Sequence, residues 1–255
     1  MTDKYKVRVS TFVADILEND ALRFGFLKNG KSNKNALLNK LIPVLLATRK
    51  ERRSKIEEIL KNEYARKDSE KIYSAVNTVI DRVYFNDENL NELEDIIWIR
   101  PSKETYCVYD EIKTSEALIT AQEVPVYIRG LLNEYACLPQ YKRELLTFDA
   151  EMEIFSEACD SHQILHFKDK ETDERYKAFA FHYYYGHLCD QTNFCVIFDI
   201  SKKQIRAIPL SKIKDAYTIK QKYKPSDYLL TQLQSYANNR LYDQSAVVEV
   251  KEDVL

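Results

Sequence analysis

The stretch Asn193-Phe-Cys-Val-Ile-Phe-Asp199, followed by Gln204-Ile-Arg-Ala-Ile-Pro-Leu-Ser-Lys-Ile213, marks the C-terminal half as rich in strands. Both runs are dominated by β-branched and aromatic residues, and the polar Ser201-Lys-Lys203 between them favours a turn. Comparable runs lie at residues 163–167, 175–185 and 215–219, after a helical pattern at 148–159. Several short strands joined by polar turns predict a small β-barrel.

The N-terminal half repeats a strand–helix–helix pattern. Residues 4–10 and 96–102 alternate apolar and polar, as half-buried strands do. In each copy a helix with Leu-Leu-Asn follows, at residues 37–39 and 131–133. We therefore predict a diverged duplication whose two strands pair within the chain. The predicted inward residues are Tyr5, Val7, Val9, Ile97 and Ile99, and the predicted outward residues are Lys6, Arg8, Ser10, Trp98, Arg100 and Ser102.

Two further regions have a helical pattern. After residues 37–41, Pro43 predicts a kink or a break, with separate helices near 49–66 and 68–84. Near the end of the sequence, a helix over 228–240 precedes a strand over 246–250. An apolar helix face beside an edge strand commonly forms a homodimer, and the alternative is packing of this helix onto its own barrel.

Composition excludes several classes of protein. The 255 residues are 45% hydrophobic and 31% charged, with 4 Gly and 6 Pro, so disordered and collagen-like classes are excluded. No run approaches the ~18 apolar residues of a membrane span, and the start lacks the apolar core of a secretory signal. The five cysteines are scattered and odd in number, which favours reduced thiols and a cytoplasmic location.

Charge is unevenly distributed along the chain. Residues 1–55 carry 13 Lys and Arg against 5 Asp and Glu, a net charge of +8, and the remainder carries 25 against 35, a net charge of −10. A basic head suggests a polyanionic partner, although a solvated helix face has the same pattern. Within this head, residues 49–55 form a candidate phosphate-binding cluster with Arg49, Arg52 and Arg53.

The C-terminal half resembles the WYL domain, an Sm-like barrel found in bacterial regulators, over about residues 148–219. The chain keeps the family's Arg206, Leu210 and Ile213, with Lys212 in place of an arginine, and has Asn193-Phe-Cys195 where the family has Trp-Tyr-Leu. The resemblance implies a groove for nucleotide or nucleic-acid ligands. Interleaved cations and aromatics suit single-stranded nucleic acid. The candidate residues are Arg206, Lys212, Lys214, Arg175, Lys168, Tyr183, Tyr185 and Phe194.

The N-terminal half resembles the ribbon-helix-helix family of DNA-binding proteins, which read the major groove with paired strands. By this resemblance, Lys6, Arg8 and Ser10 would contact bases and phosphates, beside Trp98 and Arg100. Trp98 is bulkier than the family pattern, and Pro101 removes a ribbon donor. Stacking of single-stranded bases on Trp98 is the alternative.

Metal binding and catalysis have little support in the sequence. His162 and His166 have a spacing that suits a metal on a helix, but they fall at the entrance to a predicted strand, so we expect no metal and no cofactor. Arg175 and His182 fit the loose Arg-x6-His signature of HEPN ribonucleases. Residues seven apart on a regular strand point to opposite faces, so we expect no catalytic residue.

The predicted architecture is α+β: a ribbon-helix-helix-like domain over 1–145, a WYL domain over 146–220 and a C-terminal extension over 221–255. This combination resembles the WYL accessory proteins of type VI CRISPR systems, which bind single-stranded RNA and enhance the effector ribonuclease. The resemblance implies a non-enzymatic, homodimeric protein with single-stranded RNA or DNA and a CRISPR ribonuclease as partners. A transcriptional repressor that binds duplex DNA, with a ligand-sensing WYL domain, and a nuclease using Arg175 and His182 are the alternatives.

Overall fold

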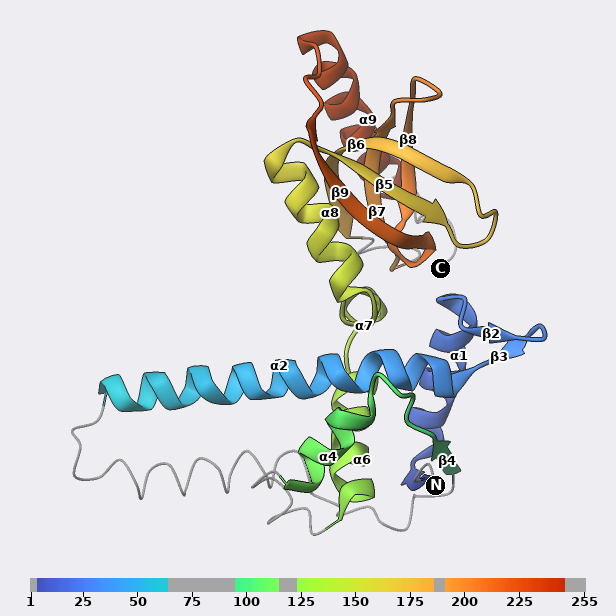
Figure 1. Cartoon of the computed structure of the whole chain (residues 1–255), viewed down its shortest axis with the longest axis vertical. Helices are drawn as coiled ribbons and strands as arrows, with labels where there is room; N and C mark the ends of the chain where they lie inside the picture. The colour runs from blue at the N-terminus through green and yellow to red at the C-terminus, as the bar shows by residue number, and fades with distance from the viewer. Residues whose placement is uncertain (1–3, 64–94, 115–122, 186–190, 246–255) are drawn as a thin grey trace, which may run out of the picture. The chain divides into compact units, whose positions relative to one another are not determined.

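The computed structural model describes residues 4–63, 95–114, 123–185 and 191–245. The chain divides into two compact units, Met1–Leu138 and Pro139–Leu255, called here the N-terminal and C-terminal units (Figure 1). The N-terminal unit contains β1 (Tyr5–Val9), α1 (Thr11–Arg23), β2 (Leu27–Lys28), β3 (Lys31–Ser32), α2 (Lys34–Glu63), β4 (Asp95–Ile99), α4 (Tyr106–Thr114) and α6 (Val124–Ala136).

The predicted intrachain pairing of the two N-terminal strands is confirmed. β1 and β4 are antiparallel, with Lys6 opposite Trp98 and Val7 opposite Ile97. The predicted inward residues of both strands are buried, and the outward positions 6, 8, 96 and 98 are exposed. Each strand is followed by a helix, α1 or α4, and α6 packs against β1. We call this two-stranded element the ribbon.

Helix α2 differs from the prediction. It runs unbroken from Lys34 to Glu63 with Pro43 inside it, so the predicted break and the separate helix at 49–66 are wrong. The predicted helix at 68–84 lies outside the described residues. Near the start of α2, the Asn33 side chain accepts a hydrogen bond from the Ala36 N–H (3.2 Å), as a helix cap does.

Two asparagines of α2 hold the end of β4. The Asn35 side chain accepts from the Arg100 N–H (2.7 Å) and donates to the Arg100 carbonyl (3.2 Å). Asn39 donates to the same carbonyl (2.9 Å) and accepts from the Ser102 N–H (2.7 Å). The two side-chain amides thus bind backbone groups of Arg100 and Ser102, which follow the last paired residue of β4. These hydrogen bonds fix the end of β4 on α2.

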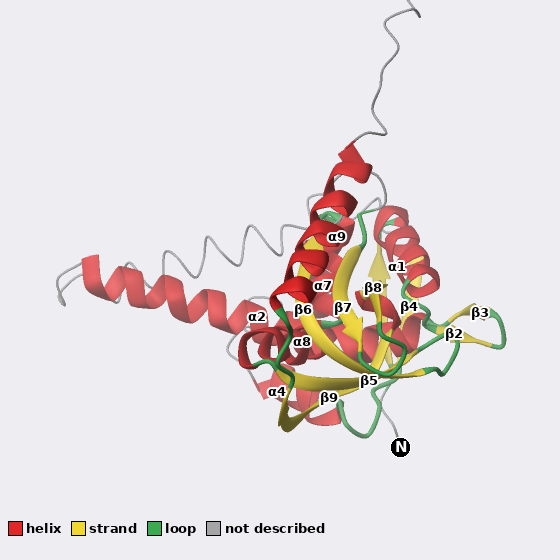
Figure 2. Cartoon of the chain, turned by 90° about the horizontal axis from the view of Figure 1, so that it is seen from above, coloured by secondary structure: helices red, strands yellow, loops and turns green. Residues whose placement is uncertain are grey.

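The C-terminal unit is built on one five-stranded antiparallel sheet with the order β8-β7-β6-β5-β9. Its elements are α7 (Gln140–Thr147), α8 (Asp149–Ser161), β5 (Gln163–Asp169), β6 (Arg175–Tyr185), β7 (Asn193–Asp199), β8 (Gln204–Pro209), the 3-10 turn η2 (Leu210–Lys212), β9 (Ile213–Lys222) and α9 (Asp227–Ser245). Figure 2 shows the curvature of these strands.

The predicted closed barrel is wrong: the sheet is open. β8 and β9 are its two edges, and the described pairings include no ladder between them. The three residues of η2 connect these edges directly, and such a segment spans only about 10 Å. The sheet therefore curls so that the end of β8 lies close to the start of β9. The described residues show no backbone hydrogen bonds between these two strands, which a closed barrel would require.

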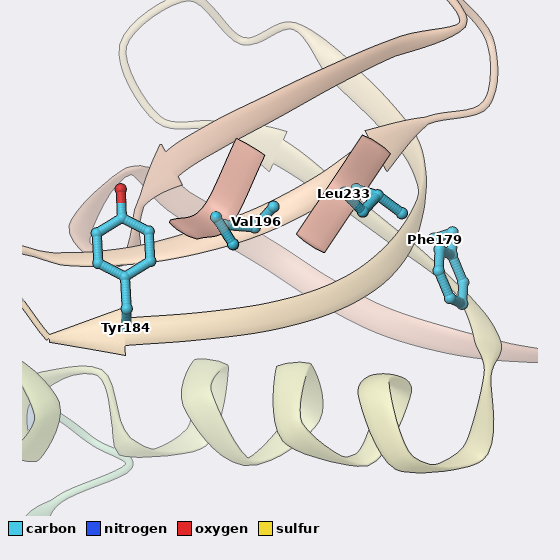
Figure 3. Packing of buried hydrophobic residues seen from close by; sticks show 5 residues of the cluster. Phe179, Tyr184, Val196 and Leu233 are labelled. Atoms are coloured by element: carbon cyan, nitrogen blue, oxygen red, sulfur yellow. The ribbon is translucent and has the colours of Figure 1, made fainter. Parts of the chain in front are cut away.

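Each face of the sheet packs against a helix. Leu233 of α9 is buried among Phe179, Tyr184 and Val196, which share one face (Figure 3). Helix α8 packs against β5, β6 and β9 on the opposite face. The apolar face of α9, which the sequence left open between dimerisation and packing, is thus covered by its own sheet. The predicted strand at 246–250 lies outside the described residues, and a homodimer stays a prediction.

The buried carboxylate of Glu144 joins α7 to the sheet. It accepts hydrogen bonds from the Asn193 N–H and the Asn193 side-chain amide (2.7 Å each), and from the Ser211 N–H (3.2 Å). Only 1% of Glu144 is exposed, and burial raises the pKa of its carboxyl against the lowering effect of these hydrogen bonds. Helix α7, β7 and η2 therefore meet at one side chain.

Candidate nucleic-acid interface

A cavity of about 320 Å³ opens on the sheet of the C-terminal unit. Its walls come from three adjacent strands, because the sheet order places β5 between β6 and β9. The register sets His166 opposite Tyr217 and Lys168 opposite Arg175. The residues that line the cavity are His166, Phe167, Lys168, Arg175, Tyr176, Asp215 and Tyr217.

An aromatic pair provides a stacking surface in this cavity. The rings of His166 and Tyr217 are stacked, with centroids 5.3 Å apart and planes 11° from parallel. Tyr217 is 54% exposed, so its ring presents area to a ligand. Burial and the nearby charge of Lys177 lower the pKa of His166, which favours the neutral form of its ring. A partly exposed aromatic pair suits a flat ring such as a nucleobase.

The two cations that line the cavity, Lys168 and Arg175, differ in their ion pairing. The Lys168 ammonium lies 2.7 Å from an Asp215 carboxylate oxygen, and this contact raises the pKa of Lys168 and lowers that of Asp215. The exposed Arg175 makes no ion pair with any other residue in the described part of the chain. Arg175 is therefore the cavity cation that meets an anion without first losing a partner.

Arg206, the main residue carried over from the WYL resemblance, does not line the cavity. Its guanidinium donates to the Tyr176 hydroxyl (3.2 Å) and to the Gln204 side chain (2.9 Å), and lies 5.6 Å from the centre of the Tyr176 ring. The Tyr176 ring in turn stacks on Phe167 at 4.8 Å. Because Tyr176 lines the cavity, Arg206 supports its wall through this stack.

The other predicted barrel residues are dispersed. Lys212 forms an ion pair with Glu171 (2.7 Å), and Lys214 is exposed in register with Lys168. Phe194 packs against the core beneath α9, with its ring stacked on Tyr184. Tyr183 pairs with Cys195 on β7, and Tyr185 is the last residue of β6.

In the N-terminal unit, the predicted phosphate-binding arginines make contacts within the unit. Arg49 is 9% exposed, lies 4.9 Å from the Tyr127 ring centre and 3.7 Å from the Glu134 carboxylate. Arg52 lies 3.5 Å from the same carboxylate, and Arg53 lies 3.3 Å from Glu57. The basic cluster of α2 thus helps to hold α2 on α6.

Of the five predicted binding residues in the ribbon region, four are exposed as predicted, and the fifth caps a helix. Lys6, Arg8, Trp98 and Arg100 are exposed. The Ser10 hydroxyl accepts a hydrogen bond from the Val13 N–H (3.4 Å), as the cap of α1. Ser10 therefore stabilises the start of α1.

The Arg175 and His182 pair departs from the predicted geometry. A bulge between Ala180 and His182 shifts the register, so both residues lie on the same face, and the expectation of opposite faces is wrong. Seven residues of strand still separate them by roughly 20 Å. That separation prevents both side chains from acting on one phosphate.

Sequence reasoning missed His166, Asp215 and Tyr217. The signal for Tyr217 was present, since it lies within an alternating strand pattern between two lysine-rich segments. Its approach to His166 depends on the pairing of β5 with β9, which lie about 50 residues apart in sequence. Nothing in either strand alone specifies that partner.

The fold defines an α+β protein of two units, one with a two-stranded ribbon and one with a five-stranded antiparallel sheet. The chain is similar in fold to a solved structure described as "Crystal structure of a CRISPR Cas-related protein", with a TM-score of 0.62 and 12% sequence identity. The match covers 91% of this chain and 66% of the other, so this chain spans about two thirds of its neighbour. No family model and no curated protein matches the sequence.

No helix in the described ranges combines the length and apolarity that a membrane span requires.

Proposed function

We propose that the chain is a non-enzymatic protein that binds single-stranded RNA in the cavity of the C-terminal unit. The observation that carries this proposal is the juxtaposition of the stacked Tyr217 and His166 rings with the exposed Arg175, which forms no ion pair within the described residues. A base stacks on the aromatic pair, and an adjacent phosphate meets Arg175. The Lys168–Asp215 pair lies at the edge of the same cavity and orients the ligand by its charges.

The cavity favours a single strand over a duplex. Stacking on Tyr217 requires a free base face, and in a duplex each base face is covered by its neighbours. A cavity of about 320 Å³ also matches the size range of small-ligand sites, and one nucleotide is a ligand of that kind.

We further propose a role as a CRISPR-associated accessory protein that acts with an RNA-guided ribonuclease in the cytoplasm. The fold likeness to a CRISPR Cas-related protein supports this proposal, as does the resemblance to WYL accessory proteins. A single-strand site would let such an accessory act on the RNA that the ribonuclease cleaves.

A transcriptional repressor with a ribbon-helix-helix domain and a WYL ligand sensor is the second candidate. The β1–β4 ribbon with its outward Lys6 and Arg8 favours it, because paired strands of this kind fit a major groove. Trp98, in register with Lys6, places an indole where groove readers have hydrogen-bonding side chains.

Competition binding separates the two candidates. We expect unlabelled single-stranded RNA to displace a labelled single-stranded RNA from the full chain at lower concentration than duplex DNA does. The logarithm of the binding constant should fall with the logarithm of salt concentration by about 0.7 per phosphate neutralised. Fluorescence anisotropy across a salt series gives both results.

Tighter, sequence-dependent binding of duplex DNA in that assay would refute the RNA proposal and favour the repressor. Incubation of the same RNA with the protein provides the enzymatic control. RNA cleavage that disappears in His182→Ala would overturn the non-enzymatic assignment.

A further inference from the structure

Among the described residues, the outer face of the ribbon has cations and no acid. Six exposed side chains alternate along the two strands and their ends: Lys4, Lys6, Arg8, Ile96, Trp98 and Arg100. None of the four cationic side chains forms an ion pair with another residue in the described part of the chain. In the C-terminal unit, by contrast, Lys168, Lys202 and Lys212 are each paired with a carboxylate. Phosphates that bind the ribbon therefore displace no ion-pair partner among the described residues.

Trp98 is the centre of this face. It is 54% exposed, and the ammonium groups of Lys4 and Lys6 lie 5.5 Å and 6.0 Å from its ring centre. Cation–π attraction favours the positions of both ammonium groups beside the ring. The result is a flat apolar surface with two positive charges at its margin.

The ribbon holds this surface in place. Val7 and Ile97, on the inner face, are buried in the core of the unit, and Asn35 and Asn39 bind the backbone at the end of β4. Trp98 therefore needs little ordering before a ligand stacks on it, which limits the entropic cost of binding.

We propose that the outer face of the ribbon is a second binding surface for single-stranded RNA, separate from the cavity. A base stacks on Trp98, and the flanking phosphates meet Lys4, Lys6 and Arg8. Indole offers one N–H donor and no acceptor, so it fits the face of an unpaired base better than the edges that a duplex groove presents. The choice of RNA rests on the function proposed above, whereas the surface itself lies wholly within the N-terminal unit.

Trp98 is the only tryptophan in the chain, so tryptophan fluorescence reports directly on this surface. We expect titration of the full chain with a short oligouridylate to quench this fluorescence saturably. Lys4→Ala combined with Lys6→Ala should weaken the binding reported by quenching about tenfold and reduce its salt slope by about 1.4. The matched control is Lys28→Ala with Lys31→Ala, which removes two exposed lysines of the β2–β3 hairpin in the same unit and should have no effect.

Variants of Trp98 test the stacking itself by anisotropy. Trp98→Ala should weaken binding to the ribbon about tenfold, and Trp98→Phe should restore most of it, because phenylalanine keeps an aromatic ring on which a base can stack. These variants are made in a chain that also carries Arg175→Ala and Tyr217→Ala, so that the cavity does not mask the effect.

Fluorescence that stays unchanged while anisotropy reports bound RNA would overturn this proposal. Stronger quenching by duplex DNA than by oligouridylate would also overturn it. Quenching in the wild type, together with an RNA affinity of the Trp98→Ala chain that Arg175→Ala and Tyr217→Ala leave unchanged, would support the ribbon and refute the cavity. The two proposals therefore fail separately.

Discussion

In a chain that also carries Trp98→Ala, which removes the stacking residue of the ribbon, replacing Arg175 and Tyr217 together with alanine should weaken single-stranded RNA binding about fifty-fold. Loss of one stacked base and one phosphate contact removes about 2.5 kcal/mol of binding free energy, at about 1.4 kcal/mol per tenfold change. Both residues are exposed, and Arg175 has no ion pair within the described ranges, so the substitutions leave the sheet intact. Fluorescence anisotropy with labelled oligouridylate measures the loss.

The matched control is Lys224→Ala with Tyr228→Ala. It removes the same charge and the same type of ring from exposed positions of the same unit, and Tyr228 is 75% exposed. We expect wild-type affinity for this variant. An unchanged affinity when Arg175 and Tyr217 are replaced in the Trp98→Ala chain, with an unchanged thermal melt, would exclude the cavity as the RNA site.

The second large effect concerns stability. Glu144→Ala should lower the free energy of unfolding by about 3 kcal/mol, because it leaves buried donors of Asn193 and Ser211 without their acceptor. Urea denaturation measures the change. Glu153→Ala, at an exposed position of α8, is the control and should be nearly neutral.

The pH dependence of the wild type gives an independent check on Glu144. Burial raises the pKa of this carboxyl above its value in the unfolded chain, so the folded state binds the proton more tightly. The contribution of this group is fully present below the ordinary carboxyl pKa and is lost as pH rises through the raised one. Glu144→Ala should lack that decrease, and an identical pH profile in both proteins would contradict the assignment.

The ribbon could be predicted from sequence because its information is local. Alternation in residues 4–10 and 96–102 predicted which side chains turn inward, and β1 and β4 pair in that way. The open edge of the sheet could not be predicted, because short alternating strands are common to open and closed sheets alike. The bulge near Phe181 was also hidden, since its run of aromatic residues has no glycine or other break.

The candidate site was predictable only in part. Lys168 and Arg175 were identified from their interleaving with aromatics, and both line the cavity. Arg49 was predicted to bind phosphate because it lies in a basic cluster. Its actual partner, Glu134, lies 85 residues further along the chain and is not apparent from the local sequence. Arg206 was carried over from a family resemblance, and its contact with Tyr176 depends on the curl of the sheet. Long-range pairing determines each of these outcomes.

Zero-length ultraviolet cross-linking of single-stranded RNA to the full chain, with the linked residues identified by mass spectrometry, tests the central claim most directly. We predict cross-links at Tyr217 or His166, the stacked pair of the cavity, and their loss in the Arg175 and Tyr217 double variant. Cross-links in the C-terminal unit that fall only outside the seven cavity residues, or none in that unit while RNA is bound, would contradict it.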